Sequence, residues 1–576
     1  MSVNQETFFN DFAAFADALN GVAKLRELIL QLAVQGKLVP QDTNDEPAAV
    51  LLAKIKAEKA QMIEEKKVKR SEPLSPIDAD DVPFDLPQGW EWGRFPELGE
   101  FGRGKSKHRP RNDPKLYTDG HYKLVQTGDV ARANGVIQTH TGLYNDVGLS
   151  QSRMWPKGTM CITIAANIAD SGILGFDACF PDSVVGFIPS AEVDDAKYFE
   201  YFMRTAQNRL LDYAPSTAQK NINLGILETV LIPLPPLNEI RRIVAKVDQL
   251  MALCDELEAR QQRQQSARVR LNNAALDRLL TARTPKEFAD HWQRLCDNFD
   301  LLYDTPATVA ALRQAILQFA VQGKLVPQDP RDEPASVLLA KIKAEKERLI
   351  QEKKIKKSET LPPIEADEVP FDLPQGWELV RLNEICLGIE AGWSPKCDPV
   401  PVSDGEWGVL KISAVSWGRF NADENKRLLP GQQPKPEFEV GRGDFLMSRA
   451  NTSELVGRSV IVEKDVRRLM MSDKVLRARF ATDVELRFVN LINNSPHAKS
   501  YYAAVATGTS DSMKNITRDQ IKNLPFPLPP LAEQHRIVAK VDHLMALCDK
   551  LEAKLRQAQS HSAKLMTATV QHLATA

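Results

Sequence analysis

One segment of the sequence has the spacing of a phosphate-binding loop. Residues 99–106, GEFGRGKS, match the pattern GxxxxGK followed by Ser or Thr, in which the Lys and Ser open a helix whose N-terminal amides face the phosphates. Here Pro110 and Pro114 follow closely and prevent a helix. The corresponding segment later in the chain reads GIEAGWSP and lacks the lysine. We therefore reject nucleotide binding and keep a phosphate-loop enzyme only as an alternative, in which Lys105→Ala would abolish nucleotide binding.

The same stretch is better interpreted as an exposed basic loop. Six basic side chains fall within nine residues: Arg103, Lys105, Lys107, His108, Arg109 and Arg111. Cations clustered in this way bind the phosphates of a nucleic-acid backbone. We therefore predict a patch that contacts phosphates.

No further catalytic pattern is present in the sequence. It contains no GxSxG, no HExxH, no dinucleotide-binding fingerprint and no NPPY or DPPY tetrapeptide of the amino-methyltransferases. The nine histidines are dispersed, and the seven cysteines include no CxxC pair, which argues against a zinc site and against a disulfide framework. We expect a chain with no catalytic residue, no metal and no cofactor of its own.

Polar loops between predicted strands are the candidates for reading DNA bases. Arg can pair with guanine and Asn with adenine through two hydrogen bonds, so loops with these residues suit the major groove. The candidate residues in the later part of the chain are Ser448, Arg449, Asn451, Thr452 and Arg458. The corresponding earlier loop contains Asn167 but no basic residue. A loop that is merely solvated remains the alternative interpretation of each.

A second pair of polar loops follows further along the chain. One consists of Ser216, Thr217, Gln219, Lys220 and Asn221, and the other of Ser510, Ser512, Lys514 and Asn515. Lys220 and Lys514 both begin the tripeptide KNI. We predict that these two lysines make equivalent contacts with phosphates.

The elements that must position these loops are written twice in the chain. ILQLAVQGKLVPQD at residues 29–42 returns with one change at residues 316–329, and VPFDLPQGWE at residues 82–91 returns unchanged at residues 369–378. The block PLPPLNEIRRIVAKVDQLMALCDELEA from Pro233 returns in similar form from Pro527. Between the blocks lie two segments that resemble each other little. We expect one scaffold of approximate two-fold symmetry that presents two recognition surfaces; the alternative is an old duplication that has drifted at its surface.

The repeated blocks are predicted to be mainly helical. After each Pro-Pro pair the apolar residues alternate in steps of three and four, which is typical of a coiled-coil seam. They are Ile243, Val247, Leu250, Cys254 and Leu257 in the first copy, and Ile537, Val541, Leu544, Cys548, Leu551, Leu555, Ala558 and Leu565 in the second. Each helix could extend over roughly 40 residues, about 60 Å, and the two can pack on each other.

Two further predicted helices, around residues 51–69 and 338–356, are rich in lysine. Interspersed glutamates favour a solvated helix or a protein-contact face, with DNA contact as the alternative. Proline-rich linkers then lead into the variable segments. At the start of the chain one apolar face requires a partner; it consists of Phe8, Phe9, Phe12, Phe15 and Leu19.

The composition indicates a soluble chain of several domains. Of the 576 residues 43% are hydrophobic and 26% are charged, and no apolar run is long enough to span a membrane. The N-terminus does not have the pattern of a secretion signal, so we expect a cytoplasmic protein. With 74 Lys and Arg against 76 Asp and Glu the net charge is -2, so any DNA binding must come from local patches or from a partner that shares the phosphates.

The order and duplication of the blocks resemble the specificity subunits of type I restriction-modification systems. The resemblance covers nearly the whole chain and rests on the PLPPLxExxRIVAKVDxLMALCDxLEA, ILQxAVQGKLVPQD and LPQGWE pairs and on the two endings with KNI. The N-terminal copy before the first variable segment is similar to the subgroup with long N-terminal regions.

This resemblance implies how the chain works with partners. It implies two target recognition domains, each reading one half of a split double-stranded DNA sequence, held apart by an antiparallel pair of long helices. It also implies two modification subunits that bind S-adenosylmethionine and methylate adenine N6, and motor-nuclease subunits that use ATP and magnesium. We expect loops in the major groove and a helical spacer that sets the half-site distance near one turn of DNA, about 34 Å.

The predicted fold is mixed α/β, with two α/β recognition domains, a pair of long coiled-coil helices and a pseudo-two-fold internal repeat. The expected divisions are an N-terminal helical repeat and linker at 1–88, recognition domain 1 at 89–235, a central helical region at 236–375, recognition domain 2 at 376–528 and a spacer helix at 529–576. A structural coiled-coil scaffold without DNA specificity is the main alternative function.

Overall fold

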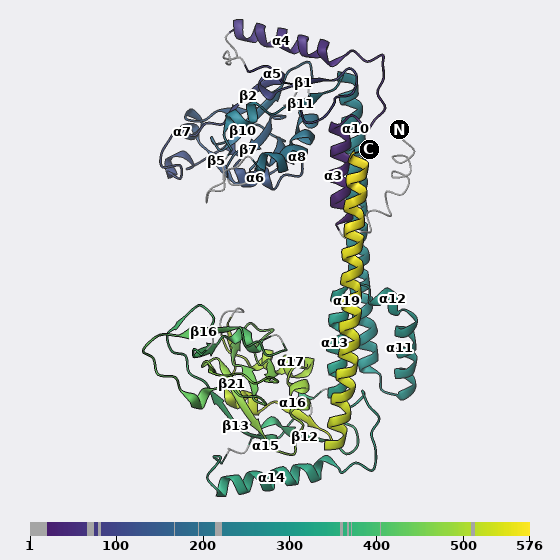
Figure 1. Cartoon of the computed structure of the whole chain (residues 1–576), viewed down its shortest axis with the longest axis vertical. Coiled ribbons are helices and arrows are strands. Elements are labelled where there is room, and N and C mark those ends of the chain that lie inside the picture. The colour runs from purple at the N-terminus through teal and green to yellow at the C-terminus, as the bar shows by residue number, and fades with distance from the viewer. Residues whose placement is uncertain are drawn as a thin grey trace. The chain divides into compact units, whose positions relative to one another are not determined.

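The computed structural model of the chain describes most of its length. The described residues are 20–65, 74–78, 82–165, 168–193, 195–212, 222–357, 361–365, 368–369, 371–403, 405–416, 418–508 and 513–575. The apolar face predicted at Phe8, Phe9, Phe12, Phe15 and Leu19 lies outside these residues. Two compact units divide the chain, one formed by residues 1–264 and 558–576 and the other by residues 265–557 (Figure 1).

Unit 1 contains recognition domain 1. Its helices are α3 (Gly21–Val34), α4 (Ala48–Glu64), α5 (Phe95–Leu98), α6 (Thr127–Ala131), α7 (Asp146–Ser150), α8 (Lys197–Asp212), α9 (Leu224–Glu228) and the first part of α10 (Leu237–Thr281). Its strands are β1 (Glu91–Gly93), β2 (Gly99–Arg103), β3 (Tyr122–Leu124), β4 (Val136–Ile137), β5 (Gly142–Tyr144), β6 (Met154–Trp155), β7 (Met160–Thr163), β8 (Ser171–Leu174), β9 (Ala178–Cys179), β10 (Val184–Pro189) and β11 (Ile232–Leu234).

Unit 2 contains recognition domain 2. Its helices are the end of α10, α11 (Pro285–Asp297), α12 (Phe299–Leu302), α13 (Pro306–Val321), α14 (Ala335–Gln351), α15 (Leu382–Ile385), α16 (Leu486–Asn493), α17 (Pro496–Val505), α18 (Arg518–Lys522) and the first part of α19 (Leu531–Thr575). Its strands are β12 (Glu378–Arg381), β13 (Cys386–Ala391), β14 (Cys397–Asp398), β15 (Gly408–Leu410), β16 (Asn425–Leu428), β17 (Phe445–Ser448), β18 (Ala450–Asn451), β19 (Ser459–Ile461), β20 (Leu469–Met470), β21 (Val475–Phe480), β22 (Lys514–Asn515) and β23 (Pro525–Leu528).

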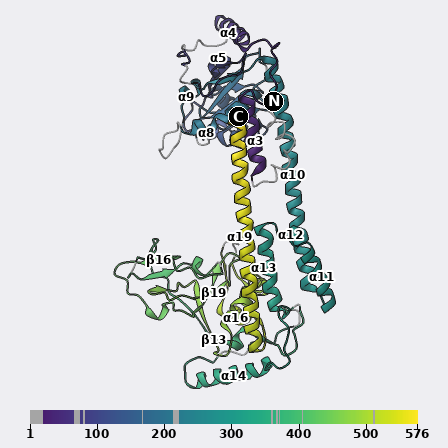
Figure 2. The ribbon, with the colours of Figure 1, turned by 45° about the vertical axis from the view of Figure 1, so that its right-hand side comes forward.

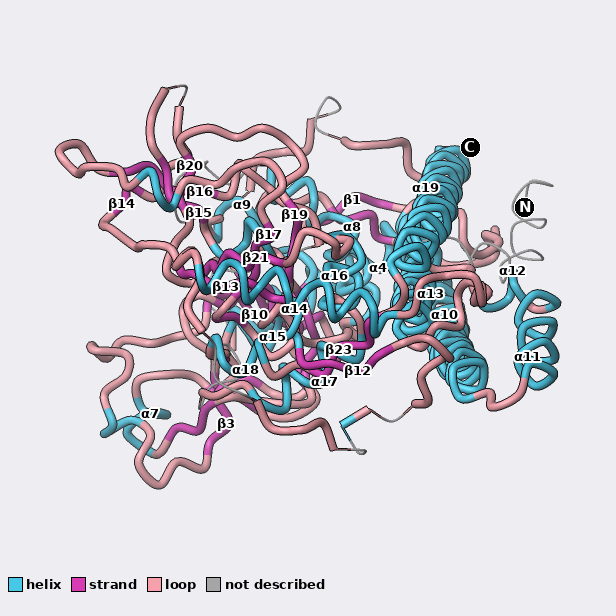
Figure 3. Tube along the Cα trace, turned by 90° about the horizontal axis from the view of Figure 1, so that it is seen from below, coloured by secondary structure: helices cyan, strands magenta, loops and turns pink. Residues whose placement is uncertain are grey.

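The two recognition domains share the central strands of both sheets although their sequences resemble each other little. The main sheet of domain 1 has the order β2-β10-β7-β8-β4, and that of domain 2 has the order β13-β21-β17-β19. A second four-stranded sheet accompanies each, with the orders β5-β3-β9-β6 and β14-β16-β15-β20. Figure 3 distinguishes these strands from the long loops that join them. The prediction of two α/β recognition domains is confirmed.

Apolar helix faces pack on the strands of both domains. In domain 1 the Phe199 ring on α8 packs edge-on against Phe187 of β10, with ring centroids 5.0 Å apart. In domain 2 Phe488 on α16 packs against Phe526 of β23 in the same way, at 6.0 Å. All four rings are buried, so each domain has a core of its own.

Both predicted spacer helices are present, and each unit contains the beginning of one and the end of the other. In unit 1 Val247 and Leu250 of α10 share a core with Met566 and Val570 of α19. In unit 2 Leu276 and Leu279 of α10 share a core to which Leu551 of α19 packs. This exchange of ends is the antiparallel arrangement that the family resemblance implied.

The predicted seam is wrong at its end. Ala558 is exposed and Leu565 is 70% exposed, whereas Met566 and Val570 are buried. From Leu555 to Met566 is eleven residues, and an eleven-residue step follows the 3.6-residue turn of a straight helix more closely than heptads do. The row of buried residues on α19 is therefore shifted by one residue relative to the predicted heptads, from Leu565 to Met566.

The lysine-rich helices α4 and α14 are fixed to the recognition domains. On α14 Glu345 accepts a hydrogen bond from Thr482 Oγ1 at 2.9 Å, and Lys346 Nζ donates to the carbonyl of Cys386 at 3.0 Å. Burial lowers the pKa of Lys346. At the equivalent places on α4, Glu58 accepts from Ser190, and Lys59 donates to the carbonyl of Pro96. Figure 2 shows α4 and α14 beside the domain of their own unit.

Candidate nucleic-acid interface

The strand register of domain 1 brings two predicted loops to one edge of its main sheet. On β10 Val185 pairs with Arg103 of β2, and the neighbouring Val184 pairs with Thr163 of β7. Adjacent strands lie about 4.8 Å apart, so the basic loop after Arg103 and the loop after Thr163 begin within roughly 10 Å of each other. We call this end of the strands the reading edge of domain 1.

The basic loop divides into exposed and internally paired cations. Arg103, Lys105 and Lys107 are exposed, with Gly104 and Ser106 buried between them, and their side chains have no hydrogen-bond or ion-pair partner among the described residues. Arg111 and Arg109 instead contact Asp182, with Nη2 to carboxylate distances of 2.6 and 3.7 Å. The first three are therefore available to phosphates.

The same segment does not have the structure of a phosphate-binding loop. Residues 99–103 form strand β2, and the next helical turn is a short 3-10 helix at Pro114–Leu116. The Ser106 side chain is buried, so it does not face a bound phosphate together with Lys105. This agrees with the rejection of the nucleotide-binding motif.

The loop between β7 and β8 is hydrogen-bonded to α8. Gln207 Nε2 donates to Asp170 Oδ1 at 2.7 Å, and the Asp170 amide donates to Thr163 Oγ1 at 3.1 Å. The amide of Ile222 donates to the carbonyl of Ile164 at 3.1 Å, so the end of the second loop joins the first. Candidate residues outside the described part of the chain are Asn167, Ser216, Thr217, Gln219, Lys220 and Asn221.

Domain 2 has a reading edge at the same end of the equivalent strands. On β21 Leu476 pairs with Ala391 of β13 and with Met447 of β17. Past this end β18 pairs with β22, so that Asn451 lies opposite Lys514 and Ala450 opposite Asn515. Two loops that the sequence predicted separately therefore form one ribbon.

The individual candidates in domain 2 differ in what they can contact. Arg449 is exposed at the ribbon, and its amide donates to the carbonyl of Lys474 at 2.8 Å. Thr452 is half-buried in the loop, where its amide donates to Asn451 Oδ1 at 2.9 Å. Lys514 Nζ donates to the carbonyl of Gly508 at 2.9 Å, whereas Ser510 and Ser512 lie outside the described residues.

Three predicted contact residues have structural partners instead. Ser448 is buried and donates to the carbonyl of Leu455 at 2.7 Å. Arg458 points back to α16, where Nη1 donates to the carbonyl of Asn494 at 3.1 Å, and burial lowers its pKa. Asn451 Nδ2 donates to Ser416 Oγ at 2.9 Å. These interactions fix the loop and do not leave the three side chains free for bases.

Sequence reasoning missed two parts of the reading edge of domain 2. Lys474 is exposed beside Arg449, and its position follows only from the pairing of β21 with β17. The backbone at Gly392 passes close to another segment, as that at Gly104 of domain 1 does. A Cβ on Gly392 would lie 2.1 Å from the carbonyl oxygen of Met471, and one on Gly104 would lie 2.3 Å from that of Phe180. The sequence had aligned these two segments, and the shared glycine was the signal that both meet the same backbone constraint.

The lysine-rich helix α14 lies at the other end of the strands. Its contacts are with Cys386, where β13 begins, and with Thr482, just after β21 ends. The reading edge is where β13 ends and β21 begins, about 20 Å away for six residues of strand. The arrangement therefore favours the predicted solvated or protein-contact face over a share in base reading.

A buried joint fixes each domain to its long helix. Trp90 Nε1, where the chain enters domain 1, donates to Glu239 Oε2 in the first turn of α10 at 3.0 Å. Trp377 and Glu533 repeat this bond at 3.0 Å in unit 2. Burial raises the pKa of both carboxyl groups. The strand pairs β1-β11 and β12-β23 lie at the same joints and tie the start of each domain to its end.

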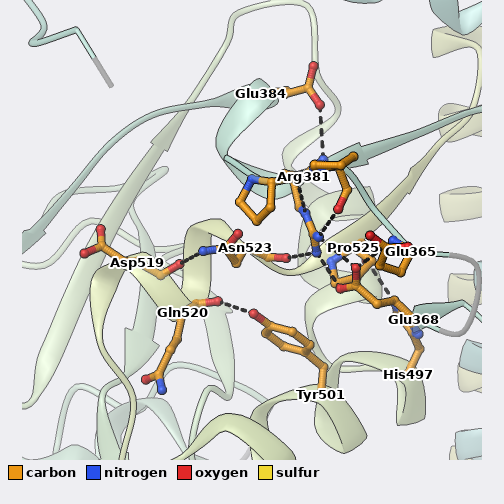
Figure 4. A network of polar contacts seen from close by, with 12 residues as sticks. Glu365, Glu368, Arg381, Glu384, His497, Tyr501, Asp519, Gln520, Asn523 and Pro525 are labelled. Atoms are coloured by element: carbon orange, nitrogen blue, oxygen red, sulfur yellow. Dashed lines mark hydrogen bonds and ion pairs between the residues drawn. The ribbon is translucent and has the colours of Figure 1, made fainter. Parts of the chain in front are cut away.

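Arg381 fastens the linker of unit 2 to domain 2 (Figure 4). Its guanidinium makes two bonds to the carboxylate of Glu368, at 2.6 and 2.8 Å, and donates to the carbonyls of Pro363 and Asn523, both at 2.9 Å. The equivalent Arg94 in unit 1 donates to the carbonyl of Ser75 at 2.5 Å. The joint and this clamp hold the sheet, and with it the reading edge, in a fixed position on its own unit.

Two features are absent from the described part of the chain, a cluster of metal-ligating side chains and a membrane-spanning helix. Among the described residues no three His, Cys, Asp or Glu side chains gather as a metal site. Within the same residues no helix is both long and apolar enough to cross a membrane. What the edges contain is loops with exposed cations and polar side chains on a rigid sheet.

Comparison with known proteins identifies the family. The family model described as "Type I restriction modification DNA specificity domain" matches residues 87–265 and 374–558. This chain belongs to that family. Each match covers one recognition domain and the first half of the long helix that follows it. The chain is thus a type I specificity subunit with two recognition domains.

Relatives of this specificity subunit match it along nearly its whole length. The specificity subunit of the type I restriction enzyme EcoEI from Escherichia coli is 35% identical, over 94% of this chain and 92% of the relative. That of EcoAI from Escherichia coli is 32% identical, over 95% and 94%. A solved chain described as "Structural basis underlying complex assembly and conformational transition of the type I R-M system" is 18% identical, with a TM-score of 0.48 over 85% of this chain and 99% of that one.

Proposed function

We propose that this specificity subunit reads a split DNA sequence, one half with each recognition domain, and that it catalyses no reaction itself. The observation that carries the proposal is the gathering of separate polar and basic segments at the same end of equivalent strands in both domains. Loops on a rigid sheet that combine cations with side chains able to pair with bases suit the major groove.

The residues of the two edges have different roles in this proposal. Arg103, Lys105 and Lys107 bind phosphates of the first half-site, and Lys474 and Lys514 bind those of the second. Arg449 pairs with a base, because it is the exposed arginine of the ribbon in domain 2. The specificity subunit then acts in the cytoplasm, on chromosomal or invading DNA.

Catalysis and cofactors belong to partner subunits in this proposal. Modification subunits bind S-adenosylmethionine and flip the adenine out of the duplex for methylation, and motor-nuclease subunits use ATP and magnesium. Two copies of the modification subunit are expected because each unit offers the same exposed apolar residues. In unit 1 these are Val50, Leu253 and Leu565, and in unit 2 they are Val337, Leu547 and Leu271.

Leu271 on α10 and Leu565 on α19 occupy equivalent positions, and they are informative because the neighbouring residues of the two helices differ. These leucines are 51% and 70% exposed and are identical, whereas the next position is Asn272 in one helix and Met566 in the other. An exposed leucine adds nothing to the core of its own chain. Its presence at both equivalent positions supports contact with two copies of one partner.

Mapping methylated adenines tests the proposal directly. DNA from cells that carry this chain and its modification subunits should be methylated at one split motif, with two defined parts and an undefined spacer. Deleting the gene for this chain alone should abolish that methylation. Methylation of the same motif without this chain, or no sequence preference with it, would support a structural scaffold instead.

A further inference from the structure

The reading loop of domain 2 is closed by a fixed base. This loop, residues 449–456, lies between Ser448 and Gly457, and the Gly457 amide donates to the Ser448 carbonyl at 2.9 Å. The Ser448 amide donates to the carbonyl of Arg458 at 2.8 Å. The direction in which the loop leaves the sheet therefore depends on where Gly457 is held.

Gly457 is held by two buried side chains that do not reach the surface. Asn493 Nδ2, at the end of α16, donates to the Gly457 carbonyl at 2.7 Å and to Ser459 Oγ at 2.9 Å. The Tyr502 hydroxyl on α17 donates to Asn493 Oδ1 at 2.7 Å. Asn493 is 2% exposed and Tyr502 is 1% exposed, so neither can touch a duplex.

The backbone at Gly457 also packs directly on Tyr502. Its φ is +79°, and a Cβ at this position would lie 2.4 Å from Cδ2 of the Tyr502 ring. Only glycine fits both the dihedral angle and the space. The Tyr502 ring packs against the backbone of Gly457. The Tyr502 hydroxyl binds the Asn493 side chain, which in turn binds the Gly457 carbonyl.

We propose that Tyr502 and Asn493 are positioning residues for the second half-site: they hold Gly457 and through it the reading loop, so that the base preference of domain 2 depends on a hydroxyl that does not touch DNA. The inference rests on the proposed function, since it assigns a role within the same reading edge. A buried amide with both ends bonded suits this task, because displacing the carbonyl would leave polar groups unpaired.

The described residues of domain 1 do not repeat this device. Its Ser171 stands at the start of β8 as Ser459 stands at the start of β19, and Ser171 Oγ donates to Glu200 Oε1 on α8 at 3.4 Å. Ser459 Oγ donates in the same way to Asn490 Oδ1, at 2.8 Å. Three residues after Glu200 comes Met203, whereas Asn493 follows three residues after Asn490. Loss of the Tyr502 hydroxyl should therefore affect one half-site alone.

The test is Tyr502→Phe, which removes only the oxygen, with Tyr198→Phe as the matched control. Tyr198 is a fully buried tyrosine of domain 1 whose hydroxyl donates to the carbonyl of Pro233 at 2.6 Å, away from any reading loop. Each variant is purified in complex with the modification subunits. Its affinity is measured for the cognate duplex and for duplexes substituted in the first or in the second half-site.

Tyr502→Phe should lower discrimination against a substituted second half-site by about 3- to 10-fold, which is the effect of one buried neutral hydrogen bond, and leave discrimination at the first unchanged. Tyr198→Phe should leave both ratios unchanged at a similar loss of thermal stability. If Tyr502→Phe weakens binding to all three duplexes equally, the positioning role is overturned and the bond is merely structural. If the wild-type complex does not discriminate between the duplexes, the proposed function fails instead.

Discussion

The two recognition domains share the central strands of both sheets but take their exposed cations from different loops. In domain 1 the cations follow the first strand of the sheet, at Arg103, Lys105 and Lys107, and the next loop has an Asn in place of a basic residue. In domain 2 the first loop has a single lysine, and the exposed cations lie after β17 and before β21, with the half-buried Lys514 on β22. The fold determines where the loops meet, and the sequence of each loop decides which of them carries the exposed cations.

The support behind the two reading edges also differs in chemistry. Glu200 of domain 1 is buried and paired with Arg204 Nε at 2.7 Å, and burial raises the pKa of its carboxyl group. The equivalent position in domain 2 is Asn490, which does not titrate. The serine at the start of the equivalent strand, Ser171 in domain 1 and Ser459 in domain 2, is therefore bound by a carboxylate that pairs with an arginine in domain 1 and by amides in domain 2. The two domains can thus change their surfaces and supports independently while the joints to the helices stay the same.

The largest effect is expected from changing the two long helices, α10 and α19, to which both domains are joined. Inserting seven residues into each long helix, at equivalent positions near its middle, should separate the domains by about 10 Å, or roughly three base pairs. Affinity for the original site should fall to the non-specific level, about 10³-fold or more. Selection from random DNA should return both half-sites unchanged with a longer spacer. An unchanged spacer would contradict the role of the helices as a ruler.

Neutralising the exposed cations of domain 1 should weaken binding without changing sequence preference. The triple variant Arg103→Gln, Lys105→Gln, Lys107→Gln should lower the salt dependence of log affinity by roughly 3, because each phosphate contact releases about one counterion. The control is Arg109→Gln with Arg111→Gln, whose side chains already contact Asp182 and should matter less. Titrations at several salt concentrations measure both, and equal slopes for the triple variant and the wild type would contradict phosphate contact.

Arg449→Ala should act on one half-site of the target. Loss of an arginine that pairs with a base costs about 1 to 3 kcal/mol and relaxes recognition at that position. The preference at the first half-site should not change, because domain 1 is a separate core. Competition binding with singly substituted duplexes gives the answer. A uniform loss on every sequence would make Arg449 a phosphate contact like the cations of domain 1.

The smallest effect is a difference in how stability depends on pH. The folded-state pKa of Glu200 is raised by burial, so its contribution to stability is fully present below the unfolded pKa, about 4.3, and is lost as the pH rises through the folded pKa. Glu200→Gln should therefore gain stability relative to the wild type as the pH is raised from about 4.3 towards neutrality. Thermal unfolding across this range measures it, and parallel curves for the two proteins would show that Glu200 does not titrate as expected.

Much of the fold was predictable because duplication and helical periodicity are local signals. The repeated blocks predicted the long helices and the two α/β domains between them. Val247 and Val541, which belong to the predicted apolar seams of these helices, are buried as expected. The heptad pattern failed at Leu565 because a straight helix drifts away from a strict seven-residue repeat.

The reading edges were predictable only in part. Polarity identified Arg449, Lys514 and the loop after Arg103, which the strand register then brought to the sheet edges. Polarity could not tell that Ser448 is buried, since a serine at the end of a strand has the same sequence signal in either orientation. Lys474 was missed because its place depends on strand pairing between residues far apart in the chain. A sequence without an alignment contains no signal for such pairings.

The most direct test of the account is to give the chain two identical recognition domains. Residues 381–525 are replaced by residues 94–231, so that the strand pairs at both joints keep equivalent partners. Because the two copies of the scaffold exchange the ends of their long helices, the account predicts methylation at an inverted repeat of the first half-site. Methylation at the original asymmetric site, or at sites without two matching halves, would contradict the claim that each domain reads its own half.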